Sequence, residues 1–207
     1  MIAVVDYGCG NLHSVSNAFE SIGEDVVIAS TPEQLQQADR IVIPGVGAFG
    51  ACMSKLQSTG LVECLVEQVR DLGKPTLGIC VGMQLMAEEG LEGSETPGLG
   101  WIDSVVKRMN ANDQGLRLPH VGWNEVLPVG DAPVFKGLGK APIFYFVHSY
   151  AMTFPNDEGP VAAWCDYGEQ FVAAIQYDNV VATQFHPEKS QDIGIRFLMN
   201  WVDLVGR

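Results

Sequence analysis

The sequence predicts an α/β fold, with a mostly parallel or mixed central sheet flanked by helices and a strand-rich C-terminal half. In the N-terminal half, short apolar runs of strand length alternate with segments whose apolar residues recur at helical spacing. From about residue 100 to 185, turn residues become more frequent and strand-like runs predominate. No repeat, low-complexity tract or convincing linker interrupts the 207 residues, so we expect one domain over residues 1–207.

The chain begins with a predicted strand, a helix and a second strand. The apolar run Ile2–Val5 has strand length and ends in a glycine-rich turn. Apolar residues then recur at helical spacing over residues 12–22, with Asn11 as the expected N-cap and Gly23 as the expected stop. Val26–Ala29 is the second apolar run of strand length.

The next elements lead to a short segment flanked by glycines. Residues 41–43 form another apolar run, and residues 61–72 repeat leucine and valine at helical spacing. Residues 76–79 predict a strand that runs into Cys80. We expect a helix over residues 82–89, so Cys80 should lie between a strand and a helix.

The C-terminal half is predicted to consist mainly of strands, at residues 105–108, 144–147, 171–177 and 180–185. The last two are close enough in sequence to form a hairpin through Asp178 and Asn179. Apolar residues at helical spacing from Ile193 to Leu204 predict a closing amphipathic helix.

Charge argues against two classes of partner. The chain has 25 acidic and 12 basic residues, for a net charge of −13, and Lys107 with Arg108 is the only adjacent basic pair. Nucleic acids and anionic membrane surfaces both require clustered positive charge on the protein. We therefore interpret the acidic excess as a contribution to solubility.

Cysteine usage and the start of the chain indicate a cytoplasmic protein. No stretch approaches the ~20 apolar residues of a membrane span, and the first residues lack the basic leader of a signal peptide. The cysteines are odd in number and contain no CxxC pair: Cys9, Cys52, Cys64, Cys80 and Cys165. This pattern suits reduced, mostly buried thiols in a reducing compartment, with room for one reactive thiol.

Cys80 is the strongest candidate for a nucleophile. It is flanked by Gly78 and Gly82, in the pattern of a nucleophile elbow that carries Cys in place of Ser. Glycines permit the sharp turn that exposes the central side chain above the sheet. In this geometry the N–H of Val81 points to where an oxyanion would form. The alternative is a buried structural cysteine in a tight turn.

A nucleophilic thiol needs a base and a group that orients the base. Among His13, His120, His148 and His186, the last follows a predicted strand directly and precedes Glu188 by two positions. In an extended segment residues two apart face the same way, so Glu188 could fix the imidazole tautomer. His186 lies 106 positions beyond Cys80, so the fold must bring them together.

Two other site types have partial signatures in the sequence. A zinc deaminase would follow its HxE element with PCxxC, which is absent from the sequence. Residues 45–50 spell GxGxxG after a predicted strand, as in dinucleotide-binding folds, with Glu67 about 20 positions on. Pro44 intervenes, and this loop does not follow the first strand. Local sequence therefore leaves two interpretations of this loop open. It could bind NAD, or it could supply a second N–H donor to an oxyanion at Cys80.

Taken together, these motifs resemble the glutaminase subunits of imidazole glycerol phosphate synthase, in the class I glutamine amidotransferase family. The resemblance covers nearly the whole chain. Cys80 with its glycines and the His186-Pro187-Glu188 element mark the larger family, and the segments 119–124 and 145–150 are similar to this subunit in particular. The resemblance implies a class I glutamine amidotransferase-like, flavodoxin-like fold.

The resemblance also implies site roles. Cys80 would be the nucleophile, His186 the base and later the acid, and Glu188 the orienting carboxylate. The remaining groups would be oxyanion donors at Gly45, Val46, Gly47 and Val81, substrate-binding residues at Gln84, Glu92, His148, Ser149 and Tyr150, and a partner interface at Pro119, His120, Trp123 and Asn124. Under this assignment the glycine loop serves the oxyanion and not NAD, and no metal or cofactor is required.

The implied activity is hydrolysis of glutamine to glutamate and ammonia through a thioester intermediate. The ammonia would pass to a (β/α)8-barrel synthase subunit in a heterodimer, for imidazole glycerol phosphate and aminoimidazole carboxamide ribonucleotide formation in histidine biosynthesis. Three other functions stay open from the residues alone. They are the same chemistry serving another acceptor enzyme, a NAD-binding module, and a catalytically silent subunit with a redox-sensitive thiol.

Overall fold

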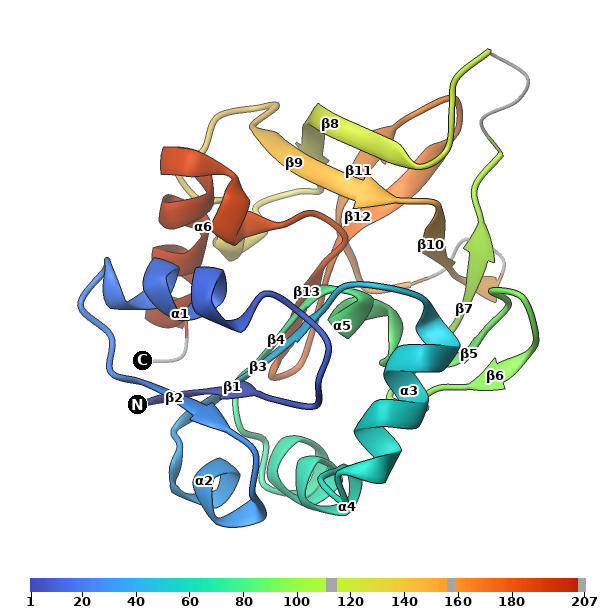
Figure 1. Ribbon diagram of the computed structural model, residues 1–207. Helices are drawn as coiled ribbons and strands as arrows, with labels where there is room; N and C mark the ends of the chain where they lie inside the picture. The colour runs from blue at the N-terminus through green and yellow to red at the C-terminus, as the bar shows by residue number, and fades with distance from the viewer. Residues whose placement is uncertain (111–114, 156–158, 205–207) are drawn as a thin grey trace.

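Two β-sheets and their covering helices make up the part of the chain that the structure describes. The computed structural model describes residues 1–110, 115–155 and 159–204. The larger sheet has nine strands in the order β2-β1-β3-β4-β13-β12-β11-β8-β9, and the smaller has four in the order β10-β7-β5-β6. The predicted α/β fold, with a mixed central sheet flanked by helices and a strand-rich C-terminal half, is confirmed (Figure 1).

The first half of the large sheet is parallel. Its strands are β1 (Ile2–Val5), β2 (Val26–Ala29), β3 (Arg40–Gly45), β4 (Thr76–Cys80) and β13 (Val180–Thr183). All four pairings among them are parallel. These strands are short and almost entirely apolar because helices cover both faces, which is the pattern that predicted them.

Helices on the two faces of this parallel half come from different parts of the chain (Figure 1). α1 (Leu12–Glu20) packs beside the C-terminal helix α6 (Gln191–Leu204) on one face. The other face carries α2 (Pro32–Gln37), α4 (Val62–Leu65) and the π-helical turn η1 (Val66–Asp71) that continues α4. Asn11 caps α1 as predicted, because its Oδ1 accepts the N–H of Ser14 at 3.2 Å.

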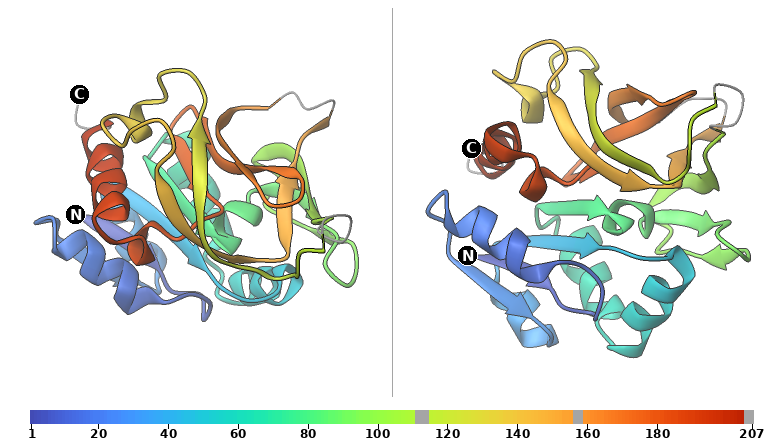
Figure 2. Two further views of the ribbon diagram at one scale, coloured as in Figure 1. Left: turned by 90° about the horizontal axis from the view of Figure 1, so that it is seen from above. Right: turned by 45° about the horizontal axis from the view of Figure 1, so that its top comes forward.

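The second half of the large sheet is antiparallel and lies above the parallel half in the right-hand view of Figure 2. Its strands are β12 (Gln170–Tyr177), β11 (Val161–Asp166), β8 (His120–Pro128) and β9 (Ile143–His148). β12 and β13 form the predicted hairpin, and Asp178 takes the positive φ of 51° that its turn requires. The short 3-10 turn η3 (Pro133–Phe135) lies between β8 and β9.

In the smaller sheet, one predicted helix was wrong. We expected a helix over residues 82–89, but α5 (Val81–Gln84) ends early and the chain turns into β5 (Ala87–Gly90). The carbonyl of Met86 accepts the N–H groups of Trp101 and Ile102, both at 2.9 Å. Pairing with β6 (Thr96–Pro97) and β7 (Ile102–Arg108) therefore overrides the local helical pattern. β10 (Tyr150–Thr153) completes this sheet.

A cluster of buried aromatic rings fixes the segment after β13. Phe185 stacks on Phe144 of β9 with ring centroids 4.0 Å apart, and Phe197 of α6 contacts both rings. Trp201 of the same helix packs against Phe19 of α1. Rings of this size dominate core energetics, so the backbone on either side of Phe185 is held firmly. Across the described ranges, no helix is both long and apolar enough to cross a bilayer.

Candidate active site

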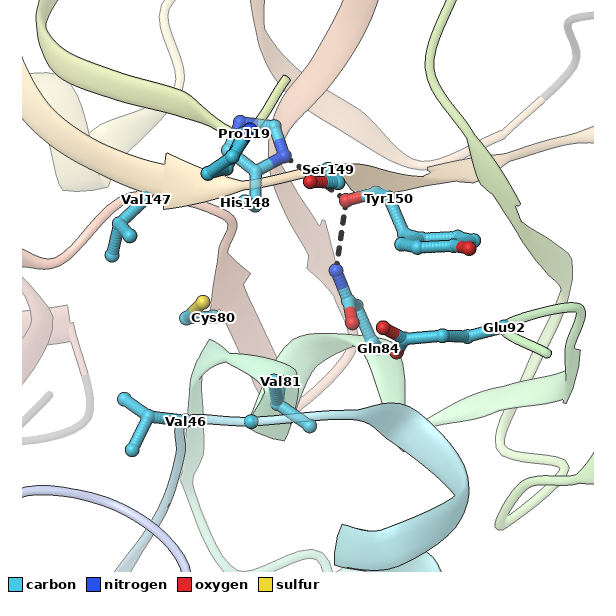
Figure 3. Close-up of a pocket in the computed structure, with 11 residues that line it drawn as sticks. Val46, Cys80, Val81, Gln84, Glu92, Pro119, Val147, His148, Ser149 and Tyr150 are labelled. Carbon is cyan, nitrogen blue, oxygen red and sulfur yellow. Dashed lines mark hydrogen bonds between the residues drawn. The ribbon is translucent and has the colours of Figure 1, made fainter.

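Cys80 occupies a strained turn at the end of β4. Its φ is 55° and its ψ is −109°, and a non-glycine residue adopts such a positive φ only where its surroundings enforce it. Gly82 is required here, because a Cβ at that position would overlap the carbonyl oxygen of Ile43. The turn directs the Cys80 side chain toward a cavity at the end of the sheet (Figure 3). α5 spans only four residues, so its helix dipole is small.

Strand pairing brings His186 to Cys80. β13 runs parallel to β4 with Thr183 opposite Ile79, so the chain beyond β13 passes beside Cys80. His186 is buried, and its Nδ1 lies 2.7 Å from Oε1 of Glu188. We expected an extended segment to align these two side chains. The structure instead has a 3-10 turn, η5 (Pro187–Lys189), which folds Glu188 back against the ring.

The charge on His186 follows from these neighbours. Burial alone would lower its pKa, but the charge and hydrogen-bonding capacity of Cys80, and then those of Glu188, raise the pKa to about 10. Its Nε2 is buried and does not meet hydrogen-bond geometry with any described residue. Nε2 is therefore the nitrogen left to face the sulfur. At neutral pH, His186 is therefore an imidazolium.

The loop after β3 lies against the same turn. β3 pairs with β4 so that Gly45 is opposite Cys80. A Cβ on Gly45 would come within 2.7 Å of the Tyr7 hydroxyl and 2.8 Å of the Gly82 nitrogen, so only glycine fits. Gly47 adopts a φ of 119°, which also favours glycine. This close approach places two turns along one cavity, with Val46 and Gly47 on one and Val81 on the other. An oxyanion site would need backbone N–H donors from such positions.

The cavity has a volume of about 250 Å³ and collects most of the predicted site residues. They line it together with Pro119 and Val147: Val46, Gly47, Cys80, Val81, Gln84, Glu92, His148, Ser149 and Tyr150. Figure 3 shows the Cys80 sulfur between the loop carrying Val46 and the strand end carrying His148. A cavity of this size suits a ligand no larger than a free amino acid.

Glu92 separates the oxyanion and dinucleotide interpretations of the glycine loop. Its Oε2 accepts the N–H of Phe49 at 2.7 Å, at the start of α3 (Phe49–Ser58). In a dinucleotide-binding fold the pyrophosphate sits at this helix start. A carboxylate occupies that position here, which argues against NAD binding by this loop.

The predicted interface residues divide between surface and interior. Trp123 is 48% exposed on β8, and Pro119 is exposed at the rim of the cavity. His120 is only 3% exposed and stacks on Tyr167 with centroids 4.0 Å apart, so it cannot contact a partner directly. Asn124 is half-buried and donates from Nδ2 to the carbonyl of Asp166 at 2.8 Å.

One polar contact to the sulfur was not predicted. Gln184 is fully buried, and its Nε2 lies 3.6 Å from Cys80 Sγ. Its position two residues before His186 was the available signal, since alternate residues of an extended segment share a side. Without the register between β4 and β13, that signal could not be linked to Cys80.

Comparison with known proteins agrees with this geometry. The family Glutamine amidotransferase class-I matches residues 3–202. The imidazole glycerol phosphate synthase subunit HisH 1 of Campylobacter jejuni (strain RM1221) is 46% identical over 204 residues, covering 99% of this chain and 100% of that protein. The subunit HisH of Methanothermobacter thermautotrophicus is 45% identical, covering 99% of each chain.

Solved structures support the fold alone. A crystal structure of a glutamine amidotransferase aligns with a TM-score of 0.75 at 20% identity, covering all of both chains. The structure of PurLQS from Thermotoga maritima aligns with a TM-score of 0.76 at 16% identity, covering 99% of this chain and 98% of that one. With full-length relatives above 40% identity and a family match over nearly every residue, the chain belongs to the class I glutamine amidotransferases and, within them, to the HisH subunits of imidazole glycerol phosphate synthase.

Proposed function

We propose that this chain hydrolyses the side-chain amide of glutamine and delivers the ammonia to a synthase subunit. That subunit forms imidazole glycerol phosphate and aminoimidazole carboxamide ribonucleotide in histidine biosynthesis. The observation that carries the proposal is that Cys80 lines an amino-acid-sized cavity and interacts electrostatically with His186, which is hydrogen-bonded to Glu188. The full-length likeness to HisH subunits supports the choice of pathway.

The geometry supports a two-stage reaction. The Cys80 thiolate attacks the amide carbon of glutamine, and N–H groups of Val81 and of the 45–47 loop stabilise the oxyanion. One such donor is worth about 2.7–4 kcal/mol in related sites. As the C–N bond breaks, His186 donates its Nε2 proton to the leaving ammonia. Neutral His186 then takes a proton from water, which attacks the thioester and releases glutamate and the Cys80 thiolate.

The substrate-binding roles follow from what the cavity offers. Gln84 uses its Nε2 inside the protein, so its Oε1 remains an acceptor toward the cavity. Glu92 uses one carboxylate oxygen on Phe49, and the other is left for the α-ammonium of glutamine. We assign the backbone of residues 148–150 to the substrate carboxylate and amide, because these residues form the opposite wall.

The docking surface in this proposal is the outward side of β8 and β9. Trp123 and Tyr145 are paired across the two strands, with ring centroids 5.8 Å apart, and Val121 lies beside them opposite Val147. Val147 also lines the cavity. A (β/α)8-barrel partner on this apolar side would cover the cavity mouth and receive ammonia before solvent protonates it. All five cysteines are unpaired thiols, which suits the cytoplasmic location that we propose.

The test compares wild type with Cys80→Ala in the reconstituted complex. We expect glutamine-dependent product formation to fall to background in the variant, while synthesis from added ammonium salt continues at the wild-type rate. Wild type should also be labelled at Cys80 by the glutamine analogue diazo-oxo-norleucine, and the variant should not. Undiminished glutamine hydrolysis in Cys80→Ala would refute the proposal.

Turnover with a non-cognate synthase gives the second measurement. The cognate partner should raise glutamine hydrolysis, and synthases of pyridoxal phosphate or polysaccharide pathways should leave it unchanged. If only one of those other synthases stimulated hydrolysis, the glutaminase activity would stand, but the assignment to histidine biosynthesis would be wrong.

A further inference from the structure

We propose, on the basis of the glutaminase function above, that Gln184 is a further catalytic residue, which donates a hydrogen bond to the reacting sulfur of Cys80. We also propose that a hydrogen-bonded relay through Gln84, the Tyr150 carbonyl, His148 and His120 holds that donor in place. The relay residues are positioning residues, since they act through Gln184. Two dashed contacts of this relay are visible in Figure 3.

The orientation of both amides follows from one backbone carbonyl. The Tyr150 oxygen can only accept, so the Gln84 group 2.9 Å away must be its NH2. The same Nε2 lies 2.9 Å from Gln184 Oε1, so that oxygen accepts the second hydrogen. The NH2 of Gln184 is then the group that faces Cys80 Sγ at 3.6 Å. A flipped Gln184 would set its NH2 against that of Gln84, so the donor toward the sulfur is fixed.

The tautomers of the two histidines follow from the same carbonyl. His148 Nδ1 lies 3.0 Å from the Tyr150 oxygen and must carry the proton. Its Nε2 is then an acceptor, so His120 Nδ1, 3.1 Å away, carries the next proton. His120 Nε2 is left to accept from Asn124 Nδ2 at 3.4 Å. The relay therefore has one direction, from Asn124 on β8 inward to the Tyr150 carbonyl.

Burial keeps this arrangement in a single protonation state. Burial, with smaller contributions from His120 and His186, lowers the pKa of His148 to about 3, although the hydrogen bond to the Tyr150 carbonyl acts in the opposite direction. Burial likewise lowers the pKa of His120 to about 4. Tyr167 and Phe146 stack on the His120 ring and leave it no room to turn. At neutral pH both imidazoles are uncharged, so each has one donor and one acceptor, as the relay requires.

A donor at this position contributes to both stages of the reaction. An N–H directed at sulfur favours the negatively charged form, which attacks the amide in the first stage and leaves the thioester in the second. The donor is a neutral amide, so it needs no proton transfer of its own. His186 stays free for the proton that goes to ammonia.

Alkylation of Cys80 tests the donor without substrate or partner. Iodoacetamide reacts with thiolates, and the Cys80 peptide can be followed by mass spectrometry at pH 7. We expect Gln184→Met, which keeps the length and loses the donor, to react about tenfold more slowly, the range for a hydrogen bond to a charged group. The control is Gln68→Met, the same change at a buried glutamine on η1, which should react like wild type. Equal rates in Gln184→Met and wild type would overturn the catalytic role.

The relay has its own measurement on the wild-type protein. Long-range ¹H–¹⁵N correlation spectra distinguish the two neutral tautomers of histidine. We expect both His120 and His148 to be neutral and protonated on Nδ1 between pH 6 and 8. A proton on Nε2 of either ring would break the relay as proposed, whatever the variants do.

The outcomes separate this inference from the glutaminase assignment. If Gln184→Met alkylates slowly but wild type does not hydrolyse glutamine with its partner, the donor stands and the proposed function fails. If wild type hydrolyses glutamine and Gln184→Met keeps its kcat and its alkylation rate, the function stands and the donor fails. With both correct, kcat falls about tenfold in Gln184→Met and KM changes less.

Discussion

His186 and His148 carry different charges because their partners differ. His186 faces a carboxylate and a sulfur, and its pKa is raised to about 10. His148 faces a carbonyl and a second imidazole, so burial is not opposed by any negative charge and its pKa falls to about 3. One imidazolium next to neutral rings means that the proton for departing ammonia has a single source, His186.

Replacement of Glu188 by glutamine tests the orienting carboxylate. Glutamine keeps the size but removes the charge that faces His186 Nδ1, and it allows the wrong tautomer. We expect kcat for glutamine hydrolysis to fall by about 10²–10⁴ with KM little changed. The alkaline decline of activity should also begin at lower pH, because the His186 pKa loses one of the contributions that raise it.

The contrary result would be a loss of activity smaller than about tenfold. A suitable control is Glu63→Gln, the same exchange at an exposed position of α4. That variant should keep the wild-type pH profile of hydrolysis.

The buried histidines make the fold sensitive to acid. The folded-state pKa of His148 lies below its ordinary value of 6.5, so below pH 6.5 the unfolded chain binds a proton that the folded chain refuses. The free energy of unfolding therefore decreases as the pH is lowered from 6.5 to about 3, by roughly 1.4 kcal/mol per pH unit for one proton. His148→Phe should show a shallower decline in urea unfolding between pH 7 and 5 than wild type.

The groups facing His148 do not reverse this sign. His186 has a raised pKa, so its contribution to the stability of the fold is fully present below pH 6.5. That contribution is lost only as the pH rises toward about 10. His120 has a lowered pKa, so its contribution to the stability of the fold is lost over the same acidic pH range as that of His148. Parallel slopes for wild type and His148→Phe would show that His148 is not held neutral.

At the level of elements, the turn from β4 to α5 depends on close backbone packing. Gly82 leaves no room for a Cβ against the Ile43 carbonyl on the neighbouring strand β3. Gly82→Ala must therefore separate β3 from the turn that carries Cys80. We expect a loss of about 3 kcal/mol in the free energy of unfolding, together with loss of Cys80 labelling by diazo-oxo-norleucine.

Gly50 in α3 provides the matched control. A Cβ there would lie 3.3 Å from the hydroxyl oxygen of Thr96, a small side-chain group that can turn aside. In a helix, alanine also costs less backbone entropy than glycine. Gly50→Ala should stay within about 1 kcal/mol of wild type. Equal stability of both variants would mean that the elbow tolerates a side chain at Gly82.

Local pattern predicted some elements well and others poorly, for a physical reason. Parallel strands such as β1 and β2 are continuous apolar runs, so their ends agreed with the prediction. β8 alternates exposed and buried residues and contains Gly122 at a φ of 142°, and it was interpreted only as a docking segment. Residues 85–90 form no helix because their hydrogen-bond partners lie on β6 and β7, which no local pattern reveals.

At the scale of the whole molecule, the site lies where the parallel and antiparallel halves of the large sheet meet. β13 pairs with β4 on one side and with β12 on the other, and it carries His186 just beyond its end. Motifs predicted which residues would gather there, since each has a recognisable neighbourhood in the sequence. Gln184 was missed, and the contact between His120 and His148 was not predicted, because strand register, and not spacing, connects these side chains to Cys80.

The outward side of the antiparallel half is apolar where a soluble monomer would place polar groups. Val121, Trp123, Leu127 and Ile143 are all at least 45% exposed on β8 and β9. Large exposed apolar patches mark interaction sites, and buried tryptophans are frequent hot spots of such interfaces. We therefore propose that Trp123 is the energetic centre of synthase docking.

Trp123→Ala should weaken binding of the synthase subunit by about 2 kcal/mol, which is about 30-fold in Kd. The control is Leu72→Ala, which removes a 63% exposed side chain that precedes β4, at the other end of that strand from Cys80. Titration calorimetry with the purified partner gives both Kd values. Alkylation of Cys80 in the free subunit should be the same in both variants, because Trp123 lies outside the cavity. If Trp123→Ala binds as tightly as wild type while Leu72→Ala binds weakly, the partner docks at the opposite end of the parallel strands. Ammonia would then have to leave a cavity that opens away from its acceptor.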